Sequence, residues 1–133
     1  MRRLLSALAL SLALPLAACD STSPDEGIDG EYVLQSINGG TLPWLVVEVG
    51  ADKLEVVSGS ILLRKDGSFL DRTTFRVTQN GTTRNEDDIY EGTFLQSATG
   101  ATLRPVGFEP YMVAIAGNRL TQLLGTAELV YLR

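Results

Sequence analysis

The stretch that decides the fold is LEVVSGSILLRKDGSFLDRTTFRVTQ, residues 54–79. Two segments rich in apolar and β-branched residues, 54–64 and 68–78, flank Asp66-Gly67, a dipeptide typical of tight hairpin turns. One face of the second segment is more apolar than the other. That face carries Phe69, Asp71, Thr73, Phe75 and Val77. The stretch therefore predicts an antiparallel β-hairpin whose more apolar face is turned toward the interior.

Short apolar segments separated by turn residues continue on both sides of this hairpin. Further strands are predicted at 30–37, 44–49, 89–96, 101–103, 111–116, 120–124 and 127–133. The polar stretch 82–88 is predicted to lie outside the strands. Pro105 and Pro110 are predicted to interrupt the ladder, because proline has no N–H to donate. Eight or nine strands joined by hairpins, without helical patterns beyond the N-terminus, predict an all-β fold, an antiparallel up-and-down β-barrel.

The N-terminus has the pattern of a secretory signal. Arg2 and Arg3 precede an apolar run over 4–16, which is too short to span a bilayer as a helix, since that takes about 20 residues. Leu16-Ala17-Ala18-Cys19 then resembles the bacterial lipobox, in which the chain is cut before the cysteine and the thiol is diacylated. The resemblance implies a signal peptide at 1–18 and fatty acyl chains such as palmitate on Cys19. The alternative is an ordinary signal peptide and an unmodified thiol, a liability in an oxidising compartment.

The lipobox also predicts how the rest of the chain is organised and where it resides. Residues 19–29 are expected to form the lipidated cysteine and a flexible tether, because they are polar and contain Pro24 and Gly27. Residues 30–133 then form one β-barrel domain. The expected location is the bacterial cell envelope, outside the cytoplasm, with the membrane as a partner through acylated Cys19. The choice between inner and outer membrane stays open.

Charge and composition argue against several classes of function. Eleven basic and sixteen acidic side chains give a formal charge of −5, and such a surface repels phosphate backbones, so no nucleic-acid binding is expected. The chain has no histidine, which removes the usual general base near neutral pH and the commonest metal ligand. We therefore predict a protein without enzymatic activity and without a cofactor.

Four carboxylates, Glu86, Asp87, Asp88 and Glu91, lie close together in the sequence. Clustered carboxylates can hold Ca²⁺ or act as the acid and base of a glycosidase. Their spacing matches no EF-hand loop, and charges near hairpin ends are usually solvated. No metal site is therefore predicted.

Several short motifs occur in an order similar to that of small bacterial lipocalin-like lipoproteins. The motifs, spread over most of residues 30–133, are GEYVLQSINGGTLP, SGSILLRKDGSF, YEGTF, GNRLT and LVYLR. Lipocalins carry Gly-x-Trp on the first strand, and an arginine of the last strand packs over that ring. The resemblance implies that Tyr32 and Arg133 take these parts, with Tyr in place of Trp. A second resemblance, to heat-shock lipoproteins of the META type, rests on SING and Leu42-Pro43, but their later Gly-Cys-Asn signature is missing.

The barrel interior is the candidate site, since an eight-stranded barrel either holds one small ligand or is filled by side chains. The residues expected to line it are Trp44, Phe69, Asp71, Thr73, Phe75, Tyr90, Phe94 and Tyr111. In a hollow barrel they form an apolar pocket, Asp71 and Thr73 orient the ligand, and Trp44 covers the mouth. In a solid barrel they are simply the core, and Trp44 anchors the start of a strand.

Three hypotheses of function therefore stay open, and the one ranked last is an enzyme that works with carboxylates. The first is a binding module for a small apolar or amphipathic ligand held in the barrel. The second is a structural or protein-interaction lipoprotein of the envelope, with a solid core and a partner protein that the sequence does not identify.

Overall fold

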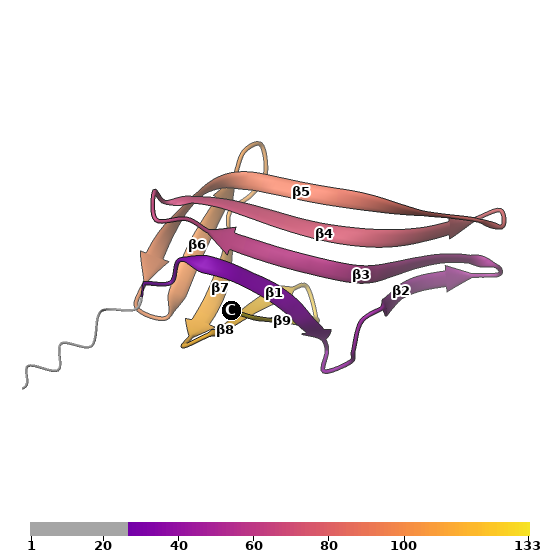
Figure 1. Cartoon of the computed structure of the whole chain (residues 1–133), viewed down its shortest axis with the longest axis horizontal. Coiled ribbons are helices and arrows are strands. Elements are labelled where there is room, and N and C mark those ends of the chain that lie inside the picture. Colours follow the sequence, from indigo (N-terminus) through magenta and orange to yellow (C-terminus); the bar gives the residue numbers. More distant parts are fainter. Residues whose placement is uncertain (1–26) are drawn as a thin grey trace, which may run out of the picture.

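The computed structural model describes residues 27–133, which form one sheet of nine antiparallel strands (Figure 1). The strands are β1 (Gly30–Ile37), β2 (Trp44–Val49), β3 (Asp52–Leu63), β4 (Ser68–Gln79), β5 (Thr82–Ser97), β6 (Gly100–Pro105), β7 (Tyr111–Ala116), β8 (Arg119–Leu124) and β9 (Ala127–Leu132). Cys19 and the segment 1–18 lie outside the described residues. Within 27–133 no helix is long and apolar enough to cross a membrane.

The sheet closes on itself as an up-and-down barrel. Strands β3 to β9 pair with their neighbours in chain order, β9 pairs with β1, and β1 pairs with β3. Eight strands thus form the closed barrel, and β2 is an additional strand on β3. The predicted fold class, an all-β antiparallel barrel with eight or nine strands, is confirmed.

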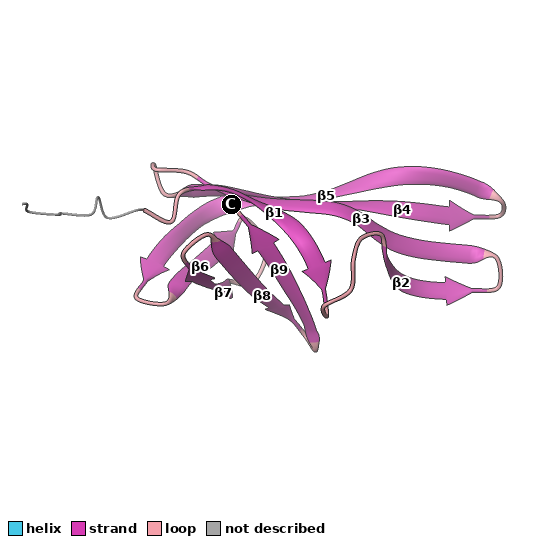
Figure 2. Cartoon of the chain, turned by 60° about the horizontal axis from the view of Figure 1, so that its bottom comes forward, coloured by secondary structure: helices cyan, strands magenta, loops and turns pink. Residues whose placement is uncertain are grey.

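β1 and β2 pair with different parts of the same edge of β3. β1 pairs with β3 only over Gly30–Val33 and then follows β9 through Ile37. β2 takes its place on β3 from Trp44 onward. Because β1 leaves β3 halfway, the barrel is closed at the end where the chain enters and splits apart at the other, as Figure 2 shows. We call these the closed end and the open end.

Beyond the open end, β3, β4 and β5 continue together as a flat extension with β2 on its edge (Figure 1). Here the prediction that residues 82–88 lie outside the strands is wrong, because β5 begins at Thr82 and pairs with β4 throughout this stretch. Side-chain hydrogen bonds support the pairing, from Thr74 Oγ1 to Asp87 Oδ1 (2.7 Å) and between the hydroxyls of Thr78 and Thr83 (3.0 Å). The stretch is polar because the extension exposes it to solvent, so its composition resembles that of a loop.

Two smaller predictions of strand limits are also wrong. Pro105 does not interrupt the ladder but ends β6, where it pairs with Gly92; proline fits there because a strand end needs fewer N–H donors. The gap between the predicted strands 44–49 and 54–64 is shorter than expected, since Asp52 and Lys53 already belong to β3. Pro110 does lie outside the strands, directly before β7.

The closed end contains the hydrophobic core. Its fully buried side chains come from six strands and are Tyr32, Ile61, Leu63, Phe69, Leu103, Leu120 and Tyr131. The whole cluster, including the partly buried residues around it, lies within residues 28–131. Residues 19–133 therefore contain every core residue that the structure describes. The experiments below use residues 19–133 with Cys19→Ser, which we call the unlipidated chain.

Tyr32 and Arg133 meet at the closed end, as the lipocalin-like resemblance implies. The Arg133 guanidinium lies 5.5 Å from the centre of the Tyr32 ring, and its Nη1 donates to the carbonyl oxygens of Gly27 (2.8 Å) and Asp29 (2.7 Å). Gly30 makes the approach possible, because a Cβ there would collide with Arg133 Cδ and the backbone has a φ of +138°. Arg133 thus holds residues 27–29 against the closed end.

Arg133→Ala is expected to destabilise the barrel. The lost cation–π contact accounts for about 0.5–2 kcal/mol, and the lost packing of the arginine stem on Tyr32 adds to it. Urea unfolding of the unlipidated chain measures the change. Arg104→Ala removes the same side chain from an exposed position on β6 and is the control. A midpoint shift no larger for Arg133→Ala than for this control would contradict the role of Arg133.

Candidate functional site

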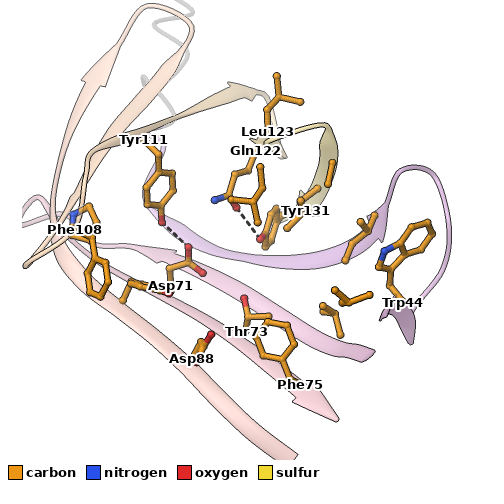
Figure 3. A pocket seen from close by; sticks show the side chains of 18 of the residues that line it. Trp44, Asp71, Thr73, Phe75, Asp88, Phe108, Tyr111, Gln122, Leu123 and Tyr131 are labelled. Carbon is orange, nitrogen blue, oxygen red and sulfur yellow. Dashed lines mark hydrogen bonds between the residues drawn. The ribbon is translucent and has the colours of Figure 1, made fainter. Parts of the chain in front are cut away.

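A cavity of about 600 Å³ lies at the open end, between the β2–β5 side of the split barrel and the wall formed by β1 and β7–β9 (Figure 3). It is lined by Ile37, Trp44, Val46, Val56, Asp71, Thr73, Phe75, Asp88, Tyr90, Pro105, Phe108, Glu109, Pro110, Tyr111, Gln122, Leu123, Leu124, Ala127, Leu129 and Tyr131. The cavity exists because β1 follows β9 away from β3, so the inward faces of β3 and β4 lose the wall that covers them at the closed end.

The rim of the cavity is built from loops and a hairpin at the open end. Phe108, in the loop between β6 and β7, packs edge-on against Tyr90 of β5, with ring centres 4.9 Å apart and planes at 85°. On the opposite side the β8–β9 hairpin contributes Leu123 and Leu124. Both sides of the mouth thus present large apolar side chains.

Trp44 is positioned by the short loop that joins β1 to β2. Its six-membered ring rests on Gly40, where a Cβ would overlap it. The loop is held in turn by Asn38, whose backbone N–H donates to the Glu128 carbonyl (2.8 Å) and whose side chain accepts from the Glu128 N–H (2.8 Å). Trp44 is the only tryptophan of the chain, so its fluorescence reports on the cavity alone.

Polar groups form the floor of the cavity. The Tyr111 hydroxyl donates to Asp71 Oδ2 (2.6 Å), and the Tyr131 hydroxyl donates to Gln122 Oε1 (3.1 Å), as Figure 3 shows. Asp71 and Gln122 are both buried, with 6% and 8% of their surface exposed. The ring of Phe69 packs edge-on beneath Tyr111, with centres 6.4 Å apart. The floor is therefore a fixed polar layer resting on the apolar core.

Burial shifts the pKa values of the ionisable side chains in this floor. It raises the pKa of the Asp71 carboxyl above its ordinary value, although the hydrogen bond from Tyr111 acts in the opposite direction. Burial and, after it, the charge of Asp71 raise the pKa of Tyr111 and of Tyr131. Both phenols are thus neutral hydrogen-bond donors at physiological pH.

The pKa of Asp71 predicts how stability depends on pH. Because this pKa is higher in the folded than in the unfolded chain, the contribution of Asp71 is fully present below the ordinary aspartate pKa. It is lost as pH rises through the folded value. Asp71→Asn keeps the shape without the charge. Compared with the parent, this variant should become steadily more stable as pH rises from the ordinary aspartate pKa, about 4, toward neutrality.

Unfolding midpoints of the two unlipidated chains across this pH range test the prediction. Glu55 and Asp66 also titrate, but hydrogen bonds from Arg76 and Ser68 lower their pKa values, so their effect on stability has the opposite dependence on pH. Both chains contain these two residues, so the difference between the chains reports on Asp71. A difference that stays constant with pH would show that Asp71 does not titrate abnormally.

The structure brings six of the eight expected ligand-binding residues together around the cavity: Trp44, Asp71, Thr73, Phe75, Tyr90 and Tyr111. The other two are not among the lining residues. Phe69 lies below the floor, fully buried in the core. Phe94 is partly buried against the core on the last part of β5, where it pairs with Leu103 of β6.

Several lining residues were not anticipated from the sequence. Gln122 shares a strand face with the buried Leu120, and Tyr131 shares one with Leu129, so alternation along β8 and β9 could have indicated them. Phe108 lies in a loop, and no strand periodicity applies to it.

The four clustered carboxylates do not act together. On β5, alternate residues point to opposite faces, so Asp87 turns toward Thr74 while Asp88 lines the cavity. Glu86 is paired with Arg84 (2.6 Å). Within the described part of the chain, no three His, Cys, Asp or Glu side chains come together in a way that could hold a metal ion.

Comparisons of the chain with family models, with curated proteins and with solved structures found no match. The fold and the cavity by themselves define the class: an antiparallel β-barrel, filled at one end and hollow at the other.

Proposed function

We propose that this protein is a lipid-anchored, non-enzymatic binding protein of the bacterial cell envelope that holds a small apolar or amphipathic molecule in the open end of its barrel. The cavity is the observation that supports this proposal most directly. Its volume of about 600 Å³ suits a small ligand, and its lining combines many apolar groups with a few fixed polar ones, as in small-molecule sites generally.

The exposed side chains at the mouth support this function. Phe108, Leu123 and Leu124 leave 63%, 68% and 65% of their surface exposed although they are large and apolar. All three line the cavity. A bound apolar molecule would cover them, and each Å² removed from water contributes about 25 cal/mol.

The position of the chain entry suits an anchored carrier. The described residues begin at the closed end, where Gly27 and Asp29 meet Arg133. The residues that line the cavity lie at the other end of the barrel. A lipid on Cys19 would therefore hold the protein by the end that does not bind the ligand.

An apolar fluorescent probe tests the proposed function. The unlipidated chain should bind one equivalent of N-phenyl-1-naphthylamine and transfer energy to it from Trp44. Phe75→Ala, which removes a ring from the cavity wall, should weaken binding by about tenfold, since the loss of such a contact amounts to more than 1 kcal/mol. Phe94→Ala removes the same ring from outside the cavity and is the matched control. Absence of saturable binding to the parent chain would contradict the proposal.

One observation favours the second function, an envelope protein that contacts another protein. Among residues 27–133 nothing pairs with two edges of the extension, those of β2 and of the first half of β5. The β5 edge is charged, but the β2 edge, WLVVEV, carries the single charge of Glu48, and unprotected apolar edges pair readily with another strand. This function becomes the better one if no apolar probe enters the cavity and a β2 substitution such as Val47→Lys abolishes an interaction in the envelope.

A further inference from the structure

The charged residues of the cavity are all of one sign. Three carboxylates line it, those of Asp71, Asp88 and Glu109, and none of the lining residues is a lysine or an arginine. Arg84, on the inner face of β5, pairs opposite Val77 beyond the cavity and is held by Glu86. An occupant of the cavity therefore meets negative charge without a compensating lysine or arginine among the described residues that line it.

The three carboxylates are placed at different depths. Asp71 is on the floor, 6% exposed. Asp88 is one step nearer the mouth, because it pairs with Thr73 while Tyr90 pairs with Asp71. Glu109 is in the rim loop beside Phe108. A ligand entering from the open end passes carboxylates along its whole path.

Asp71 retains hydrogen-bonding capacity toward the cavity. Tyr111 is the only described residue that donates to its carboxylate, and it uses Oδ2. Figure 3 shows the second oxygen of Asp71 pointing away from the Tyr111 hydroxyl. Within residues 27–133 every buried side-chain oxygen has a hydrogen-bond partner, so this second oxygen, which has none, is accessible from the cavity that Asp71 lines. It can therefore accept an N–H of a ligand or pair with a fixed positive charge.

Aromatic rings surround the same space. Six of them line the cavity: Trp44, Phe75, Tyr90, Phe108, Tyr111 and Tyr131. The faces of such rings attract cations, most strongly where water is excluded. Rings and carboxylates together provide the two kinds of group that recognise an organic cation.

We propose that the ligand is a cationic amphiphile, an apolar molecule with an amine or quaternary ammonium group that lies near Asp71. This inference rests on the proposed function and specifies its ligand class. The same cavity selects against anionic amphiphiles such as fatty acids, because their carboxylate would be desolvated beside Asp71 with no protein cation to pair with.

Three amphiphiles with the same twelve-carbon chain test the inference: dodecyltrimethylammonium, dodecanol and dodecanoate, at micromolar concentrations below micelle formation. Trp44 fluorescence of the unlipidated chain reports binding. The cation should bind at least about tenfold more tightly than the alcohol, and the carboxylate more weakly than the alcohol. Asp71→Asn should bring the cation to within about threefold of dodecanol while leaving dodecanol binding unchanged.

Two exposed positions complete the experiment, since neither substitution threatens the fold. Asp88→Asn should weaken cation binding by a smaller factor. Asp87→Asn, on the opposite face of β5, should not change it. Dodecanoate binding as tightly as the cation would overturn the inference and leave the proposed function intact. Cation preference unaffected by both Asp71→Asn and Asp88→Asn would overturn it too, because the net charge of the chain would then be the cause. No binding of any amphiphile would remove the proposed function itself.

Discussion

Phe69→Ala is expected to lower the free energy of unfolding by about 3–5 kcal/mol, the usual cost of removing a phenylalanine ring from a packed core. Phe69 has no exposed surface, and its ring supports Tyr111 from below. A loss of this size is a large part of the total stability of a small domain, which is about 5–15 kcal/mol. The variant should therefore unfold at much lower urea concentration, or fail to fold at elevated temperature.

Phe75→Ala is the matched comparison, because Phe75 is on the same face of the same strand. It lines the cavity and is partly exposed, so its removal enlarges an existing space and should cost clearly less than removal of Phe69. Urea unfolding of the two unlipidated variants measures the contrast. Equal losses at the two positions would mean that the open half is packed as solidly as the closed half, contrary to the hollow end described above.

Cys19→Ala is expected to abolish lipid attachment altogether. Cys19 is the only thiol of the chain, so no other residue can take its place in thioether acylation. Each buried methylene of an acyl chain contributes about 0.8 kcal/mol to membrane affinity, and stable anchoring takes two chains. The variant should therefore incorporate no fatty acid and should not sediment with the membranes of the producing bacterium.

Metabolic labelling with an alkyne fatty acid, followed by fractionation, measures both effects. Ser21→Ala, two residues away and outside the lipobox, should be labelled like the parent and controls for altered expression. Labelling of the Cys19 variant at the parental level would show that the chain is not a lipoprotein of this kind.

Local patterns in the sequence were sufficient to predict the antiparallel barrel. Alternation along residues 68–78 placed Phe69, Asp71, Thr73 and Phe75 on the inner face, because side chains of a strand alternate between two faces. Asp66-Gly67 marked the hairpin, and the structure has a turn there with φ of +84° at Gly67. The contact between Tyr32 and Arg133 followed from resemblance rather than from a local pattern, since about a hundred residues separate them.

The hollow end could not be predicted in the same way. Periodicity gives the face on which a side chain lies but not its depth, so Phe69 in the core and Phe75 in the cavity wall look alike in the sequence. How deeply a side chain of β4 is buried depends on where β1 leaves β3, at Val33 and Ser60. That point is set by whether β1 pairs with β3 or with β9, and both of these strands are distant from β1 in the sequence. The polar half of β5 was missed because its pairing with β4 buries little apolar surface and leaves no apolar alternation.

Native mass spectrometry tests most directly whether the open end of the barrel holds a ligand. The unlipidated chain would be incubated with a total lipid extract of a bacterial envelope, freed of unbound material and transferred intact to the gas phase. The cavity predicts a complex with one bound small molecule per chain, and loss of that complex in Thr73→Trp, where the larger side chain fills the space above Asp71. Bare chain as the only species, for the parent as well as for Thr73→Trp, would contradict the binding function.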